Sequence, residues 1–495
     1  MRQARSFHRF RAPLSRDSAP GEGPGAWREA SDATGARGNF FRAVPEKNRS
    51  RGGPDASGAS GRGLSRKRFP GRLNLFQATM LEWRDQHPYN AVHAVRIARP
   101  LDAAALARAI DAELSGSGLT GLELDRTRGR YAWRGGPAAT VLETVEPGAD
   151  WQASLAQAFE RHLNAPFARE GRLDPFRFFV MPVGADFFLG LAYDHFVAGG
   201  DSIIVLLNAI ADRYAGTPAA AAPLRLYPRT HARLFARHPI RFVRGLARLP
   251  GLAASCRRTL RQRYRAIGDG HNAFMFFTLD AARYAALRRA ARDWGVTFND
   301  TLIALLLLAQ DAVLPERDMR KRRHELAVAS IVNLRREHGD DARATFGQFL
   351  SSFRVSHPVP RGITLRELAS DVHRATARIK REKLYLTTLF AMAADRMLGR
   401  FQTPEQRIGV YAKNYPVGAG VSSINVGALW RGVDAGAAPL YVRGVPTGPL
   451  SPLVVAVTTS GDALCAGISY RTAAIERDVV DRMQADIRKR IDSLA

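Results

Sequence analysis

The chain has few cysteines, no long apolar run and no motif of the common hydrolase, nucleotide or zinc sites. Its 495 residues include only two cysteines, Cys256 and Cys465, which are too few for a disulfide-rich scaffold or a structural zinc site and favour a reducing cytoplasm. The longest uncharged apolar run covers residues 301–309, whereas a transmembrane helix needs about 20 residues. The chain has no Gly-x-Ser-x-Gly elbow, no Walker motif and no histidine pair at metal-ligand spacing, which disfavours a hydrolase, an NTPase and a zinc enzyme. We expect no bound metal or cofactor.

The net charge of +27 is concentrated in two segments. Residues 1–72 contain 16 Lys and Arg against 6 Asp and Glu, and residues 215–265 contain 12 Arg and no acidic residue. Because the rest of the chain is nearly balanced, nucleic acid is a disfavoured partner for the body of the protein. Residues 1–70 are rich in Gly, Pro and Ser and lack both periodicity and a signal-peptide apolar stretch. We expect a disordered basic tail on a cytoplasmic protein.

Two parts of similar kind follow the tail. In residues 71–220, a strand at 91–97 precedes a helix that Asp102 caps, and strands at 176–181 and 187–193 form a hairpin. The second hairpin strand is apolar almost throughout, so we expect it to be buried on both faces. Strands and helices mix without regular β-α alternation, which predicts an α+β fold.

The C-terminal part, residues 269–495, has the same mixed character. A strand at 273–278 leads to a helix that Gly295 ends, and an apolar helix follows from Asp300. Further predicted elements are strands at 326–332, 453–459 and 464–470, a helix that begins with a capping box of Thr364 and Glu367, and an amphipathic helix at the C-terminus. Two lobes are therefore expected.

Residues 221–268 form an arginine-rich connector between these parts. Within residues 225–265, arginines recur every three or four positions among apolar residues, and Pro239 and Pro250 divide the pattern into short pieces. Such a pattern suits peripheral contact with an anionic membrane surface. An acidic carrier protein as partner and a solvated crossover between the lobes are the alternatives.

The most informative segment follows the buried strand at 187–193. It reads Asp194-His195-Phe196-Val197-Ala198-Gly199-Gly200-Asp201-Ser202 and leads into a helix. An imidazole at the end of a buried strand can act as a base near neutral pH. The amides of Gly200, Asp201 and Ser202 at the helix start would favour negative charge nearby. From these residues alone, a core histidine followed by a glycine turn is an equal alternative.

Short motifs in a fixed order carry a resemblance to a known family. They are Asn74-Leu75-Phe76-Gln77, Leu163-Asn164-Ala165-Pro166-Phe167, the segment from Asp194 to Gly200, Gly295-Val296-Thr297-Phe298-Asn299-Asp300, Val332-Asn333-Leu334-Arg335, Phe346-Gly347-Gln348-Phe349 and Ser422-Ser423-Ile424-Asn425-Val426-Gly427. With this order and spacing, the chain from Leu73 onward resembles the condensation domains of nonribosomal peptide synthetases. It is also similar to their relatives, the polyketide-associated acyltransferases, wax ester synthases and alcohol acyltransferases.

The resemblance implies a fold and an activity. The fold would have two chloramphenicol-acetyltransferase-like lobes that form a V with a tunnel between them. The donor, a thioester of CoA or of an acyl carrier protein, and a hydroxyl or amine acceptor would enter from opposite faces. His195 matches the catalytic second histidine of the His-His-x-x-x-Asp-Gly motif, and Gly200 matches its glycine. The product would be an ester or amide of lipid or secondary metabolism, made by a monomer without a covalent acyl-enzyme.

Two departures from the motif favour a second hypothesis. Asp194 stands where the family has its first histidine, and Gly199 stands where it has an aspartate that usually orders the loop through an ion pair. Asp201 is a partial substitute for that aspartate. The arginine-histidine pair that usually follows the first helix is also absent, because residues 115–118 read Ser-Gly-Ser-Gly. The alternative is therefore a catalytically degenerate binding or scaffold module.

Other candidate residues have supporting roles. Ser202 belongs to the helix start, and Asn299 and Asp300 are interpreted as a helix cap. Arg335 either pairs with a structural carboxylate or contacts a phosphate of the donor. Ser423 and Asn425 are candidates for the tunnel wall, with turn residues as the alternative.

Overall fold

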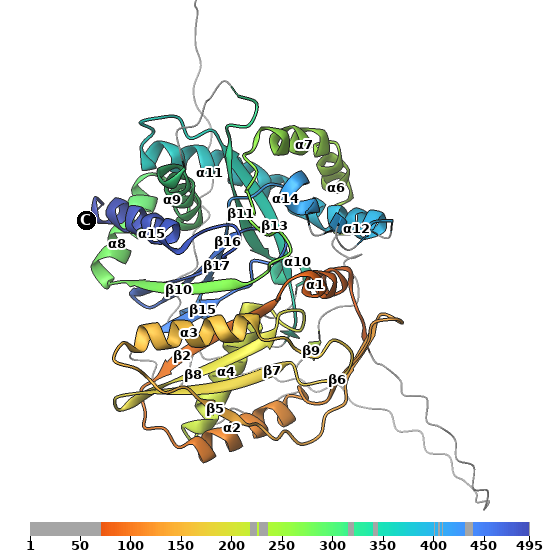
Figure 1. Cartoon of the computed structure of the whole chain (residues 1–495), viewed down its shortest axis with the longest axis vertical. Coiled ribbons are helices and arrows are strands. Elements are labelled where there is room, and N and C mark those ends of the chain that lie inside the picture. The colour runs from red at the N-terminus through yellow and green to blue at the C-terminus, as the bar shows by residue number, and fades with distance from the viewer. Residues whose placement is uncertain are drawn as a thin grey trace, which may run out of the picture. The chain divides into compact units, whose positions relative to one another are not determined.

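Two large β-sheets form the frame of the described chain (Figure 1). The computed structural model describes residues 71–217, 225–226, 236–314, 321–339, 345–399, 401–403, 406–407, 409–430 and 439–494. The predicted tail, residues 1–70, and the connector residues Arg229 and Arg233 lie outside the described residues. Strands and helices mix in both halves, so the predicted mixed α/β fold class is confirmed.

The N-terminal half builds most of a five-stranded sheet with the order β15-β2-β8-β7-β5. β7 (Phe176–Val183) and β8 (Asp186–Asp194) form the predicted hairpin, and Gly184 turns it with a φ of +64°. Every residue of β8 after the first is buried, as its apolar sequence predicts. β8 also pairs with β2 (Asn90–Ile97), so the strand that leads to His195 is central in the sheet.

Helices in this half pack against one another and against both large sheets. Asp102 caps α2 (Ala103–Gly116), as predicted. α4 (Gly200–Tyr214) packs against α2, whereas α3 (Trp151–Asn164) contacts both β2 and β10 (Asn272–Leu279) of the second sheet. The other elements here are β1 (Gly71–Arg72), α1 (Leu75–Gln86), β3 (Leu122–Asp125), β4 (Arg130–Trp133), β5 (Leu142–Thr144) and β6 (Gly171–Leu173).

The C-terminal half builds a six-stranded sheet with the order β10-β17-β16-β14-β11-β13. A capping box of Thr297 and Asp300 begins its central helix, α9 (Phe298–Val313), whose apolar residues are almost all buried. The other strands are β11 (Leu326–Asn333), β13 (Leu350–His357), β14 (Ala419–Asn425), β16 (Leu453–Ser460) and β17 (Ala463–Arg471). The helices that pack with α9 are α8 (Ala281–Asp293), α11 (Leu365–Glu382) and α15 (Arg477–Asp492).

One strand of the C-terminal half belongs to the N-terminal sheet. β15 (Tyr441–Gly444) pairs antiparallel with β2 and also contacts β16 and β17. The boundary at residue 269 assigned this segment to the C-terminal lobe, but its hydrogen bonds place it on the N-terminal sheet. β15 therefore joins the two sheets beside the motif.

The described part of the connector forms two short helices, α6 (Pro239–Leu246) and α7 (Leu249–Arg258). Pro239 and Pro250 each lie in a first helical turn, so the predicted division is confirmed. The remaining elements are β9 (Arg225–Leu226), α10 (Arg335–His338), β12 (Thr345–Phe346), α12 (Leu386–Gly399), α14 (Val410–Asn414) and a short helix, Val426–Ala428. No described helix is by itself long and apolar enough to cross a membrane.

Candidate functional site

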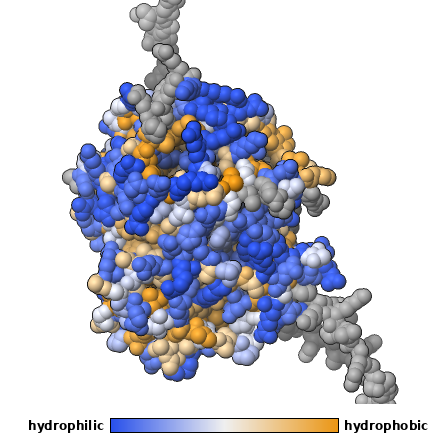
Figure 2. Space-filling model, viewed as in Figure 1, coloured by the Kyte–Doolittle hydropathy of each residue, from blue (hydrophilic) through white to orange (hydrophobic). Residues whose placement is uncertain are grey.

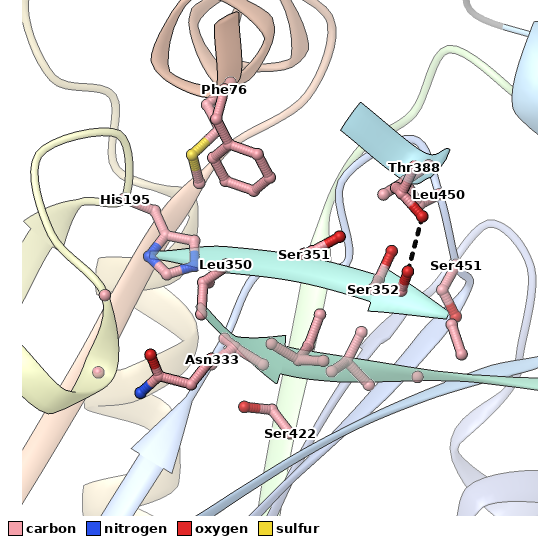
Figure 3. Close-up of a pocket in the computed structure, with 18 of the residues that line it drawn as sticks. Phe76, His195, Asn333, Leu350, Ser351, Ser352, Thr388, Ser422, Leu450 and Ser451 are labelled. Carbon is pink, nitrogen blue, oxygen red and sulfur yellow. Dashed lines mark hydrogen bonds between the residues drawn. The ribbon is translucent and has the colours of Figure 1, made fainter. Parts of the chain in front are cut away.

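A mostly apolar cavity of about 1020 Å³ is lined by residues of both large sheets. His195 reaches it from the loop after β8, and Phe76 reaches it from α1 (Figure 3). Leu350 of β13, Asn333 of β11 and Ser422 of β14 line it from the C-terminal half. The cavity is large enough for a drug-sized or larger organic ligand.

His195 is held firmly at the end of β8. Only 8% of the residue is exposed, and its amide donates to the carbonyl oxygen of Tyr89 at 3.2 Å. The rings of Tyr89 and Tyr193 flank the imidazole, each with its centroid 5.7 Å away. The imidazole is therefore oriented before any ligand binds.

Gln348 holds the backbone around this imidazole. Its amide nitrogen donates to the carbonyl oxygens of His195 and, at 2.6 Å, Ala198, and lies 3.3 Å from Nδ1 of His195. An amide nitrogen has two hydrogens, and the two carbonyl oxygens can accept both of them. Gln348 therefore fixes the position of the loop that carries His195.

Burial keeps the imidazole neutral. Desolvation lowers the pKa of His195 to about 4, with a smaller lowering by the charge of Arg443, while the hydrogen bond to Ala198 acts in the opposite direction. At neutral pH the ring is therefore unprotonated and available as a base.

The start of α4 offers two unused amides. Gly199 is the N-cap, and the amide of Ser202 donates to its carbonyl at 3.1 Å. The prediction that all three amides face a ligand is wrong for Ser202. Among the described residues, no acceptor bonds the amide of Gly200 or Asp201, and both residues line the cavity. Two amides at a helix N-terminus can still stabilise negative charge.

Gly200 is required by close packing rather than by its backbone angles. A β-carbon there would lie 2.6 Å from Cδ1 of Ile424 and 3.3 Å from Nη1 of Arg443. Gly200 is therefore a point of close contact between the two halves of the protein.

Asp194 and Gly199, the two positions that differ from the His-His-x-x-x-Asp-Gly motif, both lie against other side chains. Asp194 forms a buried ion pair with Arg84 of α1, whose other nitrogen donates to the carbonyl oxygen of Arg169 at 2.8 Å. A β-carbon at Gly199 would lie 3.2 Å from Oε1 of Gln348. Gln348 thus fills the space beside Gly199 and binds the loop carbonyls itself. Sequence reasoning missed Arg84 and Gln348 as site residues, although the segment around Gln348 was noted as a motif.

Arg335 supports the start of α4 from the C-terminal half. It is buried, donates to the Ser202 hydroxyl and the Thr345 carbonyl oxygen at 2.6 Å each, and lies 3.6 Å from the Asp201 carboxylate. Asn333 also donates to Asp201. These contacts favour the structural-carboxylate interpretation of Arg335. The role of Asp201 as a partial substitute for the motif aspartate stays a prediction.

The remaining predicted residues lie on or near the cavity wall. Ser423 donates to the side chain of Asn299 at 3.3 Å, and Asn299 donates to Ser330 at 3.2 Å. The cap interpretation is thus confirmed for Asp300 but wrong for Asn299, which bonds to the sheet. Ser423 and Asn425 line the cavity, and their roles with substrate stay predictions.

Two buried residues beside the motif had no sequence signal. His93 of β2 bonds the Tyr441 hydroxyl at 2.8 Å through Nδ1, and burial lowers its pKa well below the usual range. Arg443 of β15 lines the cavity next to Gly200. Within the described ranges, no three His, Cys, Asp or Glu residues are grouped to hold a metal ion.

Comparisons with known proteins define the fold. The chain matches no protein-family model and no curated protein. It does match the solved first condensation domain of the calcium-dependent antibiotic synthetase, with a TM-score of 0.61 and 18% identity over 86% of this chain and 96% of that one. The chain has a condensation-domain fold. The resemblance that the motifs predicted is therefore confirmed for the fold.

Other proteins with the condensation-domain fold differ in activity. The condensation domain of the Monacolin K polyketide synthase MokA matches with a TM-score of 0.57 and 13% identity, over 86% of this chain and 96% of that one. An epimerization domain from tyrocidine synthetase B matches with a TM-score of 0.55 and 12% identity, over 86% of this chain and 95% of that one. The condensation-domain fold thus supports more than one reaction, and the site must specify which.

Proposed function

We propose that this protein transfers an acyl group from a thioester donor to a hydroxyl or amine acceptor, with His195 as the general base. The observation that carries the proposal is the oriented, neutral imidazole of His195, which lines a large, mostly apolar cavity. An apolar cavity suits an acyl chain, and a neutral imidazole suits proton abstraction.

In this mechanism, the unprotonated ring nitrogen of His195 takes the proton of the acceptor O–H or N–H while the acceptor heteroatom attacks the thioester carbonyl carbon. The resulting oxyanion lies next to the imidazolium that has just formed, and the opposite charges attract each other. When the carbon–sulfur bond breaks, the imidazolium returns the proton to the leaving thiolate. The donor is an acyl-CoA or an acyl carrier protein thioester, as the family resemblance implies.

The altered motif does not by itself favour the alternative of a degenerate binding module. Gln348 orders the loop at Gly199, and the Arg84–Asp194 pair fills the position of the first histidine. Both replacements leave His195 and the amides of α4 in place. A degenerate module would have no need to keep the base oriented.

The test is product formation from a panel of acyl-CoA and acyl carrier protein thioesters with pooled alcohols, amines and amino acids, followed by mass spectrometry. The wild-type protein is expected to form an ester or amide. His195→Ala is expected to lose about 10²- to 10⁴-fold in rate while keeping its fold by circular dichroism. Product that forms equally with His195→Ala, or no product with any donor, contradicts the proposal.

The helices α6 and α12 support peripheral contact with an anionic membrane. On α6, Ile240 and Val243 are 67% and 64% exposed beside the exposed Arg241 and Arg244. α12 packs against α6 and exposes further apolar side chains, those of Phe390, Met397 and Leu398. Figure 2 shows this apolar surface at the upper right. Apolar side chains next to arginines suit the boundary between lipid headgroups and acyl chains.

A further inference from the structure

Arg443 is a buried cation without a carboxylate partner. Only 1% of the residue is exposed. Its Nε donates to the Thr458 hydroxyl at 2.9 Å, and its Nη2 donates to the carbonyl oxygens of Ser422 and Val457 at 2.7 and 2.8 Å. Among the described residues, no carboxylate forms an ion pair with Arg443 and no acceptor bonds its Nη1.

Such an arrangement is unfavourable unless something else compensates the charge. A buried charge that is unpaired is strongly destabilising, and desolvation lowers the pKa of Arg443. Asp201 is near enough to act on Arg443, but its carboxylate lies 3.6 Å from Arg335 and accepts from Asn333. The hydrogen bonds that Arg443 makes to the sheet could be made by a neutral amide. The charge itself therefore needs an explanation.

The free nitrogen of Arg443 faces the start of α4. Nη1 lies 3.3 Å from the position that a Gly200 β-carbon would take, and Cε1 of His93 lies 3.5 Å from the same point. The unused amides of Gly200 and Asp201 belong to the same corner, and all four residues line the cavity. A guanidinium nitrogen and two helix-start amides are donors without acceptors.

We propose that Arg443 and the start of α4 bind a carboxylate of the acceptor, so that the acceptor is an amino acid or a hydroxy acid. The inference rests on the proposed acyl transfer and names its substrate class. The product is then an N-acyl amino acid or an O-acyl hydroxy acid. A carboxylate has two oxygens, which match one guanidinium nitrogen and the helix-start amides.

A permanent anion fits this site better than an oxyanion that exists only during the reaction. The guanidinium is charged at every working pH, so it attracts an anion already in the bound substrate. Arg443 and His195 line the same cavity, so one acceptor can place its carboxylate at Arg443 and its amine or hydroxyl toward His195.

The test measures binding rather than turnover. Calorimetry compares N-dodecanoylglycine with N-dodecanoylglycinamide, which differ in the carboxylate alone, on the full chain. The wild-type protein is expected to bind the acid on the order of 10- to 100-fold more tightly than the amide. Arg443→Gln is expected to abolish this preference while leaving the affinity for the amide unchanged. Arg471→Gln is the matched control, because Arg471 is equally buried but lies outside the cavity.

His195→Ala separates this inference from the proposed acyl transfer. It is expected to keep the preference for the acid even though it loses turnover. Equal affinity of the wild-type protein for acid and amide overturns the inference, and so does a preference that survives in Arg443→Gln. The inference would also be overturned, in favour of a phosphate ligand, if dodecyl phosphate bound more tightly than N-dodecanoylglycine and this binding depended on Arg443. The comparison on the wild-type protein decides the matter even if Arg443→Gln does not fold.

Discussion

A β-carbon at Gly199 would meet the side-chain oxygen of Gln348 at 3.2 Å. The two positions therefore share one space beside the loop that carries His195. With glycine at 199, Gln348 can reach the carbonyls of His195 and Ala198 and order the loop from the C-terminal half. Gln348 thus contacts the loop at the position where the resemblance expects an aspartate.

This shared space predicts coupling between the two positions. Gln348→Ala leaves two buried carbonyls unsatisfied and should lower the free energy of unfolding by about 1–3 kcal/mol for each carbonyl. Gly199→Asp should also destabilise, because the new side chain meets Gln348. The double variant should be more stable than the sum of the single effects predicts, as measured by urea denaturation. Additive effects would show that the residues do not compete for space.

The pH dependence of kcat/KM should reveal the buried base. His195 must be neutral to accept a proton, and burial lowers its pKa to about 4. Activity should therefore stay constant from neutral pH down to about pH 5 and fall as the pH decreases through 4. Circular dichroism at each pH would verify that the protein remains folded. A midpoint near 6.5, the ordinary value for histidine, would mean that His195 is solvated in solution.

The sequence was sufficient for features that depend on local patterns. The β7–β8 hairpin, the cap at Asp102 and the position of His195 all follow from neighbouring residues. The resemblance to condensation domains added the global fold. Local patterning also predicted a helix directly after the His195 segment, although it could not show that the Ser202 amide is already used.

The rest of the site depends on contacts between distant segments. Arg84 and Gln348 reach the loop from α1 and from the segment before β13, and Arg443 arrives on a strand that pairs with β2. Neither Arg84 nor Arg443 is distinguished by spacing or periodicity, and the motif around Gln348 did not indicate the contact of this side chain with the loop. Only tertiary structure shows that Arg443 has no carboxylate partner among the described residues, so a binding role for it was not predictable from the sequence.

The buried ion pair at the end of β8 should be strongly coupled. Asp194→Asn leaves Arg84 charged and buried without its partner, which should lower the free energy of unfolding by about 3–5 kcal/mol. Replacement of both residues, as Arg84→Met with Asp194→Leu, should cost much less, because no charge is left buried. Denaturant titration of the three variants measures the coupling. If the double variant were no more stable than Asp194→Asn, the loss of stability in Asp194→Asn would not come from the unpaired charge of Arg84.

Membrane contact predicts a specific dependence on α6. The full chain should sediment with vesicles of phosphatidylglycerol and phosphatidylcholine but much less with phosphatidylcholine alone, since Arg241 and Arg244 favour anionic lipid. The double variant Ile240→Ser, Val243→Ser removes the exposed apolar side chains of α6 and should weaken this binding severalfold or more.

Val141→Ser serves as the control for that experiment, because Val141 is 88% exposed in the N-terminal half, away from α6. It should bind vesicles like the wild-type protein. High salt should weaken the binding of both, because the attraction of the arginines is screened. Vesicle binding that is unaffected by the α6 substitutions would place the membrane contact elsewhere. Binding of an acyl carrier protein that is lost in the α6 variant, without any vesicle binding, would instead identify this surface as a docking site for the donor protein.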